Sequence, residues 1–331
     1  MAASLRYSYR ESIISPVNDT GFTPSTLVLM GIPGLERFHV WFAAPLCIIY
    51  IITLLANSTL LIAIKTVTQL HKPMYLFISQ QALSDLTLSS CIIPKILGTF
   101  WLNDGEISFS GCLVQMYFVA LFSAFKSSIL LAMAFDRYVA VCKPLRYNSI
   151  VTNSLIAKIW AVCLGRAMFL VSPAPLLLLR IPYCSRYIAS SDCEHMAVAK
   201  LSCADITLNS VYALVTSLFM GSVDISGIAM SYILILRTVL HLPKEDRVKA
   251  FSTCGSHICV LSVSYIPYFF TIIFHRLRNG IPLYAHVIVS RIYLIFPPMV
   301  NPLIYGGTMK EVRQGVLQVF RKIKDRMNFC L

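Results

Sequence analysis

Asp136, Arg137 and Tyr138 follow one another at the end of a long apolar run, where charged groups meet the edge of a hydrophobic phase. A charged pair in this place is costly to bury, so it can act as a two-state switch between helices. Alternatively, Arg137 only anchors the helix end among polar head groups, as long basic side chains do. The residues alone leave both interpretations open.

Asp85 lies inside another apolar run, where a carboxylate is a functional candidate and needs a partner. Residues that could perform catalysis do not cluster. The seven histidines, at positions 39, 71, 195, 241, 257, 275 and 286, lack the spacing of a metal site. We therefore expect no catalytic residues, no metal and no cofactor, and do not expect an enzyme.

The composition indicates what surrounds these residues. Of 331 residues, 57% are hydrophobic and 13% charged, which is far from the composition of a soluble domain. The net charge of +13 does not indicate nucleic-acid binding, because the basic residues fall between apolar runs. The chain is expected to be an integral membrane protein.

Seven apolar stretches are each long enough to cross a bilayer as a helix, which takes about 20 residues. They are Val40–Ile64, Met74–Phe100, Cys112–Val141, Leu155–Leu179, Ile206–Leu236, Phe251–Phe274 and Leu283–Tyr305. The predicted fold is all-α: a seven-transmembrane helix bundle followed by a short amphipathic eighth helix. We expect an extracellular segment at 1–38, a receptor domain at 39–306, and a cytoplasmic amphipathic helix and tail at 307–331.

Lys and Arg concentrate in the first, third and fifth connections and in the tail, which places these on the cytoplasmic side and the amino terminus outside. Asn18, in the sequence Asn-Asp-Thr, is a candidate glycosylation site on the outer segment, although such a triplet also arises by chance. Asn57 has the same pattern inside the first span and is interpreted as a helix-packing residue. The protein is expected in the plasma membrane.

Four cysteines fall on the predicted outer side: Cys112 at the head of the third span, and Cys184, Cys193 and Cys203 in the long connection after the fourth. Oxidised cysteines are usual there. Four cysteines allow three pairings, and the residues do not choose among them.

Four longer motifs identify a family. LHKPMYLFI enters the second span, MAFDRYVAVCKPLRY closes the third, KAFSTCGSHICVL enters the sixth and PPMVNPLIY ends the seventh. Together they resemble the olfactory receptors of the rhodopsin-like G protein-coupled class, over about residues 31–313. CEHMAVAKLSCAD and His275-Arg276 resemble their class I, or fish-like, subdivision.

The resemblance implies how the outer cysteines are paired and which residues switch on activation. It implies disulfides Cys112–Cys193 and Cys184–Cys203, which would tie the long outer loop to the third span. It favours the switch interpretation of Asp136-Arg137-Tyr138, with Arg137 freed on activation to meet a G protein. The further residues that it implies for activation are Tyr232, Asn301, Pro302 and Tyr305.

Lys126 departs from the family, which usually has a Glu at this position. With a rise of about 1.5 Å per residue, Lys126 lies about 17 Å above Arg137, and Asp85 about 18 Å above Pro73 at the mouth of its helix. The two charges should meet at one depth. We predict an Asp85–Lys126 ion pair that displaces the sodium ion which the resemblance implies near Asp85. The alternative is that Lys126 points away from the bundle and snorkels.

The ligand is expected between the outer halves of the third, fifth, sixth and seventh spans. The third span has no acidic residue from Cys112 to Phe135, which disfavours cationic ligands. Arg276 resembles the Arg that class I receptors for carboxylic acids have at the matching position, where it is implied to anchor the carboxylate of the ligand. A guanidinium offers paired hydrogen-bond donors that fit a carboxylate. Arg291 is a candidate second cation. The remaining predicted contacts are Met116, Ala120, Phe269 and Ile272 as apolar wall, with His195 and Met196 from the loop above.

The predicted function is odorant-activated signalling, with small carboxylic-acid-like odorants as ligands and a stimulatory, olfactory-type G protein raising cAMP. The predicted partners are therefore the odorant, the G protein and the bilayer, without nucleic acid. A non-odorant rhodopsin-like receptor remains an alternative. A membrane transporter is a less favoured alternative, because transporters commonly contain internal repeats and these spans show no obvious one.

Overall fold

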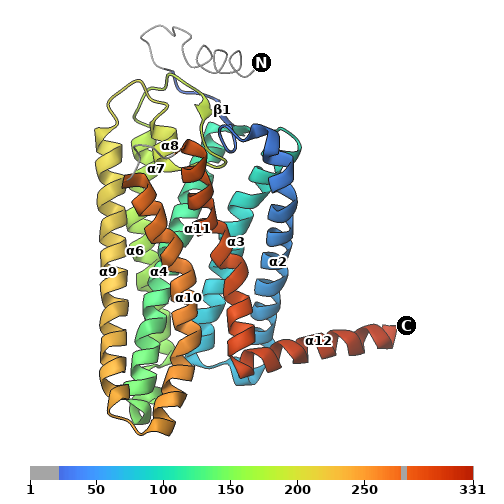
Figure 1. Ribbon diagram of the computed structural model, residues 1–331, viewed down its shortest axis with the longest axis vertical. Coiled ribbons are helices and arrows are strands. Elements are labelled where there is room, and N and C mark those ends of the chain that lie inside the picture. Colours follow the sequence, from blue (N-terminus) through green and yellow to red (C-terminus); the bar gives the residue numbers. More distant parts are fainter. Residues whose placement is uncertain (1–21, 277–281, 331) are drawn as a thin grey trace.

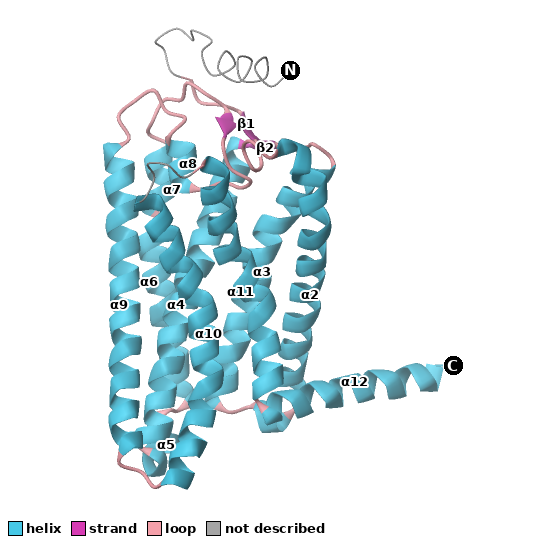
Figure 2. Ribbon diagram, viewed as in Figure 1, coloured by secondary structure: helices cyan, strands magenta, loops and turns pink. Residues whose placement is uncertain are grey.

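The computed structural model describes residues 22–276 and 282–330. Seven long helices stand side by side in one bundle, and an additional helix extends sideways from one end of it (Figure 1). Small strands and two short helices cover the opposite end (Figure 2). We call this the capped end, and the other the α12 end.

The bundle helices follow the apolar runs of the sequence. They are α2 (His39–Thr66), α3 (Pro73–Trp101), α4 (Phe109–Cys142), α6 (Asn153–Val171) continued by α7 (Pro173–Leu178), α9 (Thr207–Leu240), α10 (Lys244–Arg276) and α11 (Leu283–Thr308). The break between α6 and α7 falls at Ser172, before Pro173, because proline has no N–H to continue the helical ladder.

Five of these segments are long and apolar enough to cross a membrane by length and composition alone: Glu36–Thr66, Phe109–Cys142, Asn153–Leu178, Thr207–Leu240 and Leu283–Thr308. α3 and α10 are more polar, and α3 carries both Asp85 and Lys95. Both pack within the same bundle, α3 against α2, α4 and α11 and α10 against α11 and α4. The fold is the predicted seven-helix membrane bundle.

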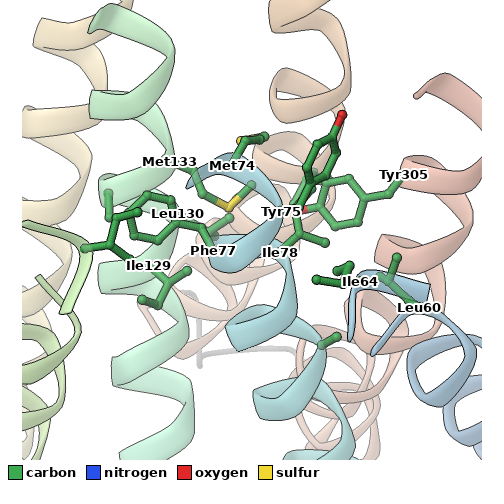
Figure 3. Close-up of a cluster of buried hydrophobic side chains, with 14 of the residues drawn as sticks. Leu60, Ile64, Met74, Tyr75, Phe77, Ile78, Ile129, Leu130, Met133 and Tyr305 are labelled. Carbon is green, nitrogen blue, oxygen red and sulfur yellow. The ribbon is translucent and has the colours of Figure 1, made fainter. Parts of the chain in front are cut away.

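Apolar packing is continuous across the bundle toward the α12 end. Figure 3 shows Phe77 and Ile78 of α3 between side chains of α4, among them Ile129 and Met133, and Tyr305 of α11. Apolar burial between helices supplies less driving force in lipid than in water, so close packing has to hold the helices together.

The connecting segments at the α12 end are η2 (Thr68–Leu70), η3 (Pro144–Arg146) and α5 (Tyr147–Ile150). The predicted eighth helix is α12 (Lys310–Cys330), longer than expected. Its buried Val312 and Val319 belong to the bundle core, while Arg313, Arg321 and Lys322 are exposed. This two-sided character suits a helix at a membrane surface.

The capped end holds a three-stranded sheet that the sequence did not predict. Its strands are β1 (Thr26–Leu29), β2 (Glu106–Ser108) and β3 (Tyr187–Ile188), in the order β2-β1-β3. β1 pairs antiparallel with β2 and parallel with β3. The same end carries η1 (Glu36–Phe38) and α8 (His195–Ala199).

Two disulfides fix the long connection that forms this cap. Cys112 of α4 is bonded to Cys193, and Cys184 is bonded to Cys203, with Cα atoms 5.4 Å apart in each pair. This is the pairing that the family resemblance implied. The first disulfide anchors the cap to the head of α4.

Candidate functional site: a polar core, a cavity and a charged pair at the α12 end

The centre of the bundle holds a buried ion pair between α4 and α3. Lys126 Nζ lies 2.5 Å from Asp85 Oδ1, and both side chains are almost fully enclosed. The second carboxylate oxygen of Asp85 accepts a hydrogen bond from Asn301 Nδ2 of α11 at 2.9 Å. Asp85 therefore connects three helices, and Lys126 faces the bundle interior rather than snorkelling.

Two neighbouring hydrogen bonds extend this polar core. Asn57 Nδ2 of α2 donates to the carbonyl of Pro298 at 2.9 Å, which agrees with its interpretation as a helix-packing residue. Tyr305 donates to Gln81 Oε1 of α3 at 3.3 Å. Pro302 is buried between Asn301 and Tyr305 and interrupts the backbone ladder of α11, since its nitrogen carries no hydrogen.

A second buried ion pair was missed by the sequence reasoning. Asp224 of α9 is 0% exposed and accepts hydrogen bonds from Arg166 of α6 at 2.7 Å and from Ser127 of α4 at 2.6 Å. Ser127 also lies 3.0 Å from the hydroxyl of Tyr265 on α10. Three helices therefore meet at one carboxylate, and Ser127 connects it to a fourth. Both charges lie inside apolar runs, which was a sufficient signal to single them out.

A cavity of about 370 Å³ lies between these two ion pairs and the capped end. Its volume falls within the usual range of small-molecule pockets, about 300–1,000 Å³. Lys126, Ser127 and Tyr265 form part of its wall, so both polar clusters border it. The other lining residues are Leu88, Ala120, Ser123, Ala124, Leu130, Glu194, Ser217, Met220, Gly221, Ser264, Tyr268, Tyr293, Leu294 and Pro297.

Hydroxyl groups give this cavity its chemistry. Ser264 Oγ is buried without a hydrogen-bond partner among the described residues. An ammonium group offers three N–H donors, and Asp85 takes one of those of Lys126. The wall can therefore donate hydrogen bonds to an oxygen of a bound molecule.

Of the eight predicted ligand contacts, Ala120 lines this cavity. Met116 is buried beneath the cap, packed with Cys112, and His195 lies on α8 with its ring against Tyr212. Met196 follows it on α8. These three are not among the residues that line the cavity, to which the cap contributes Glu194 instead.

Phe269 was expected in the cavity wall but does not line it, and its side chain is 45% exposed on the surface of the bundle. The side chains of Ile272 and Arg276 lie outside the described residues, although the backbone of α10 reaches Arg276. Asn18 also lies outside the described residues.

Arg291 was expected to be a second cation in the ligand pocket, and the structure places it differently. Its guanidinium forms an ion pair with Asp192, lies 3.7 Å from Glu194 Oε2 and donates to Ser190 Oγ at 3.2 Å. The cap compensates the charge with two carboxylates, and Arg291 lines a different cavity. It is a cap-anchoring residue of α11.

The charged pair at the α12 end is closed. Arg137 donates to Asp136 Oδ2 from two nitrogens, at 2.6 and 3.2 Å, and Tyr147 donates to Asp136 Oδ1 at 2.6 Å. Burial, and then the charge of Asp136, raise the pKa of Tyr147, so its phenol stays protonated and keeps donating. Asp136 thus holds Arg137 and the loop helix α5 together.

Two further predicted activation residues lie close by. The hydroxyl of Tyr232 on α9 and Nδ1 of His257 on α10 share a hydrogen bond at 2.8 Å. Tyr138 is partly buried, and Lys143 Nζ lies 5.8 Å from its ring centre. The Tyr232 bond joins two helices on the same side of the bundle as Arg137.

The bundle, the cavity below the cap and the closed charged pair at the far end together define a seven-helix membrane receptor. Comparison with known proteins agrees. The family model described as olfactory receptor matches residues 46–323, and the chain belongs to this family. It is an odorant-sensing G protein-coupled receptor in a membrane, not an enzyme, and its ligands are small odorants.

Human olfactory receptors are among its relatives. Olfactory receptor 52K1 is 45% identical over 309 residues, which cover 93% of this chain and 98% of the relative. Olfactory receptor 52B2 is 44% identical, with 94% and 97% covered. Olfactory receptor 52D1 is 47% identical, with 89% and 94% covered.

Proposed function

We propose that this receptor detects small carboxylic-acid-like odorants and signals through a stimulatory, olfactory-type G protein that raises cAMP. The observation that carries the ligand class is the cavity wall, where the Lys126 ammonium stands among serine and tyrosine hydroxyls, while the Glu194 carboxylate on the same wall lies 3.7 Å from the guanidinium of Arg291. The ammonium and every one of these hydroxyls can donate a hydrogen bond to an oxygen atom. Bonds to a charged carboxylate are about twice as strong as neutral ones.

Arg276 supplies the second cation in this proposal. It ends α10, the helix that also contributes Ser264 and Tyr265 to the cavity. A guanidinium at this point would bind the carboxylate of a ligand whose chain lies in the cavity. The cavity holds about twelve water-sized groups at roughly 30 Å³ each, which suits a short-chain acid.

Neutral oxygen-bearing odorants are the second candidate. The charge of Lys126 is compensated by Asp85 at 2.5 Å, which reduces its attraction for another anion. An alcohol or a ketone would use the same hydroxyl donors without competing with Asp85.

A matched ligand series tests the proposal. Cells that express the full chain are given octanoic acid, octanol or octylamine, and cAMP is measured. We expect the acid to act at the lowest concentration and the amine to be inactive. A stronger response to octanol would favour the neutral class, and a response without G protein would overturn the receptor mechanism.

Arg276→Ala tests the anchor. It should abolish the response to octanoic acid while surface expression stays unchanged, and Arg186→Ala, which removes an exposed guanidinium in the cap, is the matched control. Retention of full acid sensitivity by Arg276→Ala would remove Arg276 from the site.

The proposed orientation places the capped end outside the cell and α12 on the cytoplasmic face of the plasma membrane. Disulfides at the cap suit the oxidising side, and the exposed basic residues of α12 suit an anionic inner leaflet. Asn18 would then carry a glycan. Peptide-N-glycosidase treatment should shift the mass of the wild type and not of Asn18→Gln.

The proposed activation step is the release of Arg137 from Asp136 so that it meets the G protein. Tyr138, Tyr232, Asn301, Pro302 and Tyr305 act with it. Release of the Tyr232–His257 bond would let α9 and α10 separate at the α12 end, and Pro302 provides the bend in α11.

A further inference from the structure

A second cavity of about 230 Å³ lies near the capped end, between α2, α3 and α11. All of its lining side chains are apolar except Ser191 and Arg291. Ile96 and Phe100 of α3 are buried at its inner side. Phe42 of α2 and Ile292 and Phe296 of α11 line it as well and are exposed on the outer surface of the bundle. The cavity therefore borders the part of that surface that faces lipid.

The polar end of this cavity has unused hydrogen-bond donors. Ser191 Oγ and Arg291 Nε are buried and have no hydrogen-bond partner among the described residues. Ser191 is 0% exposed. Buried polar atoms are nearly always paired, so two unpaired ones on the wall of one cavity indicate a missing acceptor.

The charge around Arg291 limits what that acceptor is. One guanidinium faces two carboxylates, those of Asp192 and Glu194, so no positive charge is left uncompensated. A carboxylate would meet like charges there, and an ammonium has no lone pair to offer. A neutral oxygen, in a hydroxyl or a carbonyl group, accepts from both donors without repulsion.

The volume of the cavity limits the size of the apolar part of the ligand. At roughly 30 Å³ for each water-sized group, the cavity holds about eight of them. This matches a single short alkyl chain and is too small for the two chains of a phospholipid. The exposed apolar edge provides access from the bilayer, where such molecules dissolve.

We infer that this cavity is a second binding site, for a neutral single-chain alcohol or carbonyl compound that reaches it through the bilayer, with Ser191 and Arg291 as hydrogen-bond donors. The site is separate from the odorant cavity. Arg291 lines the second cavity, and its partner Glu194 lines the first. The inference does not depend on the ligand class proposed for the first cavity.

Photolabelling of the full chain in lipid nanodiscs tests the inference. The probes are octanol and octanoic acid, each carrying a diazirine on the chain, and labelled peptides are located by mass spectrometry. We expect saturable labelling by the alcohol around Phe42 and Ile292, displaced by unlabelled octanol, with weaker labelling by the acid. Non-saturable labelling, or equal labelling of lipid-facing peptides of α9, would overturn the site.

Ser191→Ala removes one donor without removing a structural contact, because Ser191 Oγ bonds to no described group. It should raise the half-saturating concentration of the alcohol probe about fivefold, the equivalent of one hydrogen bond. The matched control is Ser226→Ala on α9, whose hydroxyl bonds only to Val223 of its own helix. Equal half-saturation in both variants and the wild type would overturn the assignment of Ser191.

Ile292→Trp fills the exposed edge of the cavity and should block labelling. Leu214→Trp, at an exposed position on α9, should leave labelling intact. Neither measurement uses cAMP, so the failure of this inference and the failure of the proposed function are distinguishable.

Discussion

Lys126 Nζ and Asp85 Oδ1 lie 2.5 Å apart in the middle of the bundle and join α4 to α3. An ion pair buried this deeply is stable only while both members are present, since either charge alone lacks compensation. It also borders the proposed odorant cavity through Lys126. The same contact therefore joins two helices and forms part of the cavity wall.

Removal of one member should destabilise the receptor strongly. Lys126→Met and Asp85→Asn should each lower stability, by about 3–5 kcal/mol where a charge is left unpaired, and the double variant by less than the sum. Thermal unfolding of the purified receptor measures this. Lys126→Glu, which opposes two carboxylates, should reduce surface expression further and change basal cAMP. Parental values for both in Lys126→Glu would show that the pair is unimportant.

Asp224 should be as sensitive as Asp85. Asp224→Asn leaves Arg166 unpaired and weakens the link from Ser127 to α9, so we expect lower thermal stability and a weaker odorant response. The matched control is Asp104→Asn, which breaks the exposed pair with Lys95. Exposed pairs contribute little, so the control should behave as wild type. Equal effects of the two substitutions would argue against a special role for Asp224.

Asp136→Asn should raise basal signalling. It weakens the bonds to Arg137 and Tyr147, and hydrogen bonds to a charged group contribute about 1.5–3 kcal/mol. The closed state loses that free energy, so basal cAMP without odorant should rise several-fold. Tyr147→Phe, which removes one bond, should raise it less. Asp325→Asn on the exposed face of α12 serves as control, and unchanged basal cAMP in Asp136→Asn would refute the switch.

His195 should make the cap sensitive to acid. Burial lowers the pKa of His195 below its ordinary value of 6.5, although Glu194 nearby opposes this. The unfolded chain therefore binds the proton more readily than the folded one, and stability falls as pH drops below about 6.5. Thermal unfolding between pH 7.5 and pH 5.5 should show a smaller loss for His195→Gln than for wild type. His241→Gln, in an exposed position, should show the full loss.

The sequence predicted the helices well because membrane spans leave long apolar runs. It predicted shorter helices than the structure contains. α9 continues past its apolar segment through Arg237, and α10 begins before its apolar segment, at Lys244. Polar residues can continue a helix outside the lipid, where water solvates them. Hydropathy alone therefore does not reveal these ends of the helices. The cap sheet escaped prediction because strands of two to four residues carry almost no periodic pattern.

The site was predictable from the sequence where the depth of a residue along its helix was sufficient to place it. Depth along a helix follows from counting residues, and this placed Lys126 level with Asp85. Rotation about a helix is less certain. Phe269 and Arg291 had plausible depths, yet one is exposed on the bundle surface and the other turns to the acidic residues of the cap.

The central position of β1 has a consequence for how the chain is made. β1 is synthesised early, but its partners β2 and β3 come much later in the chain, β3 about 160 residues on. At about 5–20 residues per second, the ribosome needs on the order of ten seconds to deliver β3. β2 follows β1 by about 80 residues, but until β3 is made the other edge of β1 has no partner, and a chain stalled before β3 would expose that edge to chaperones. Completion of the sheet therefore reports that translation has passed the fourth span.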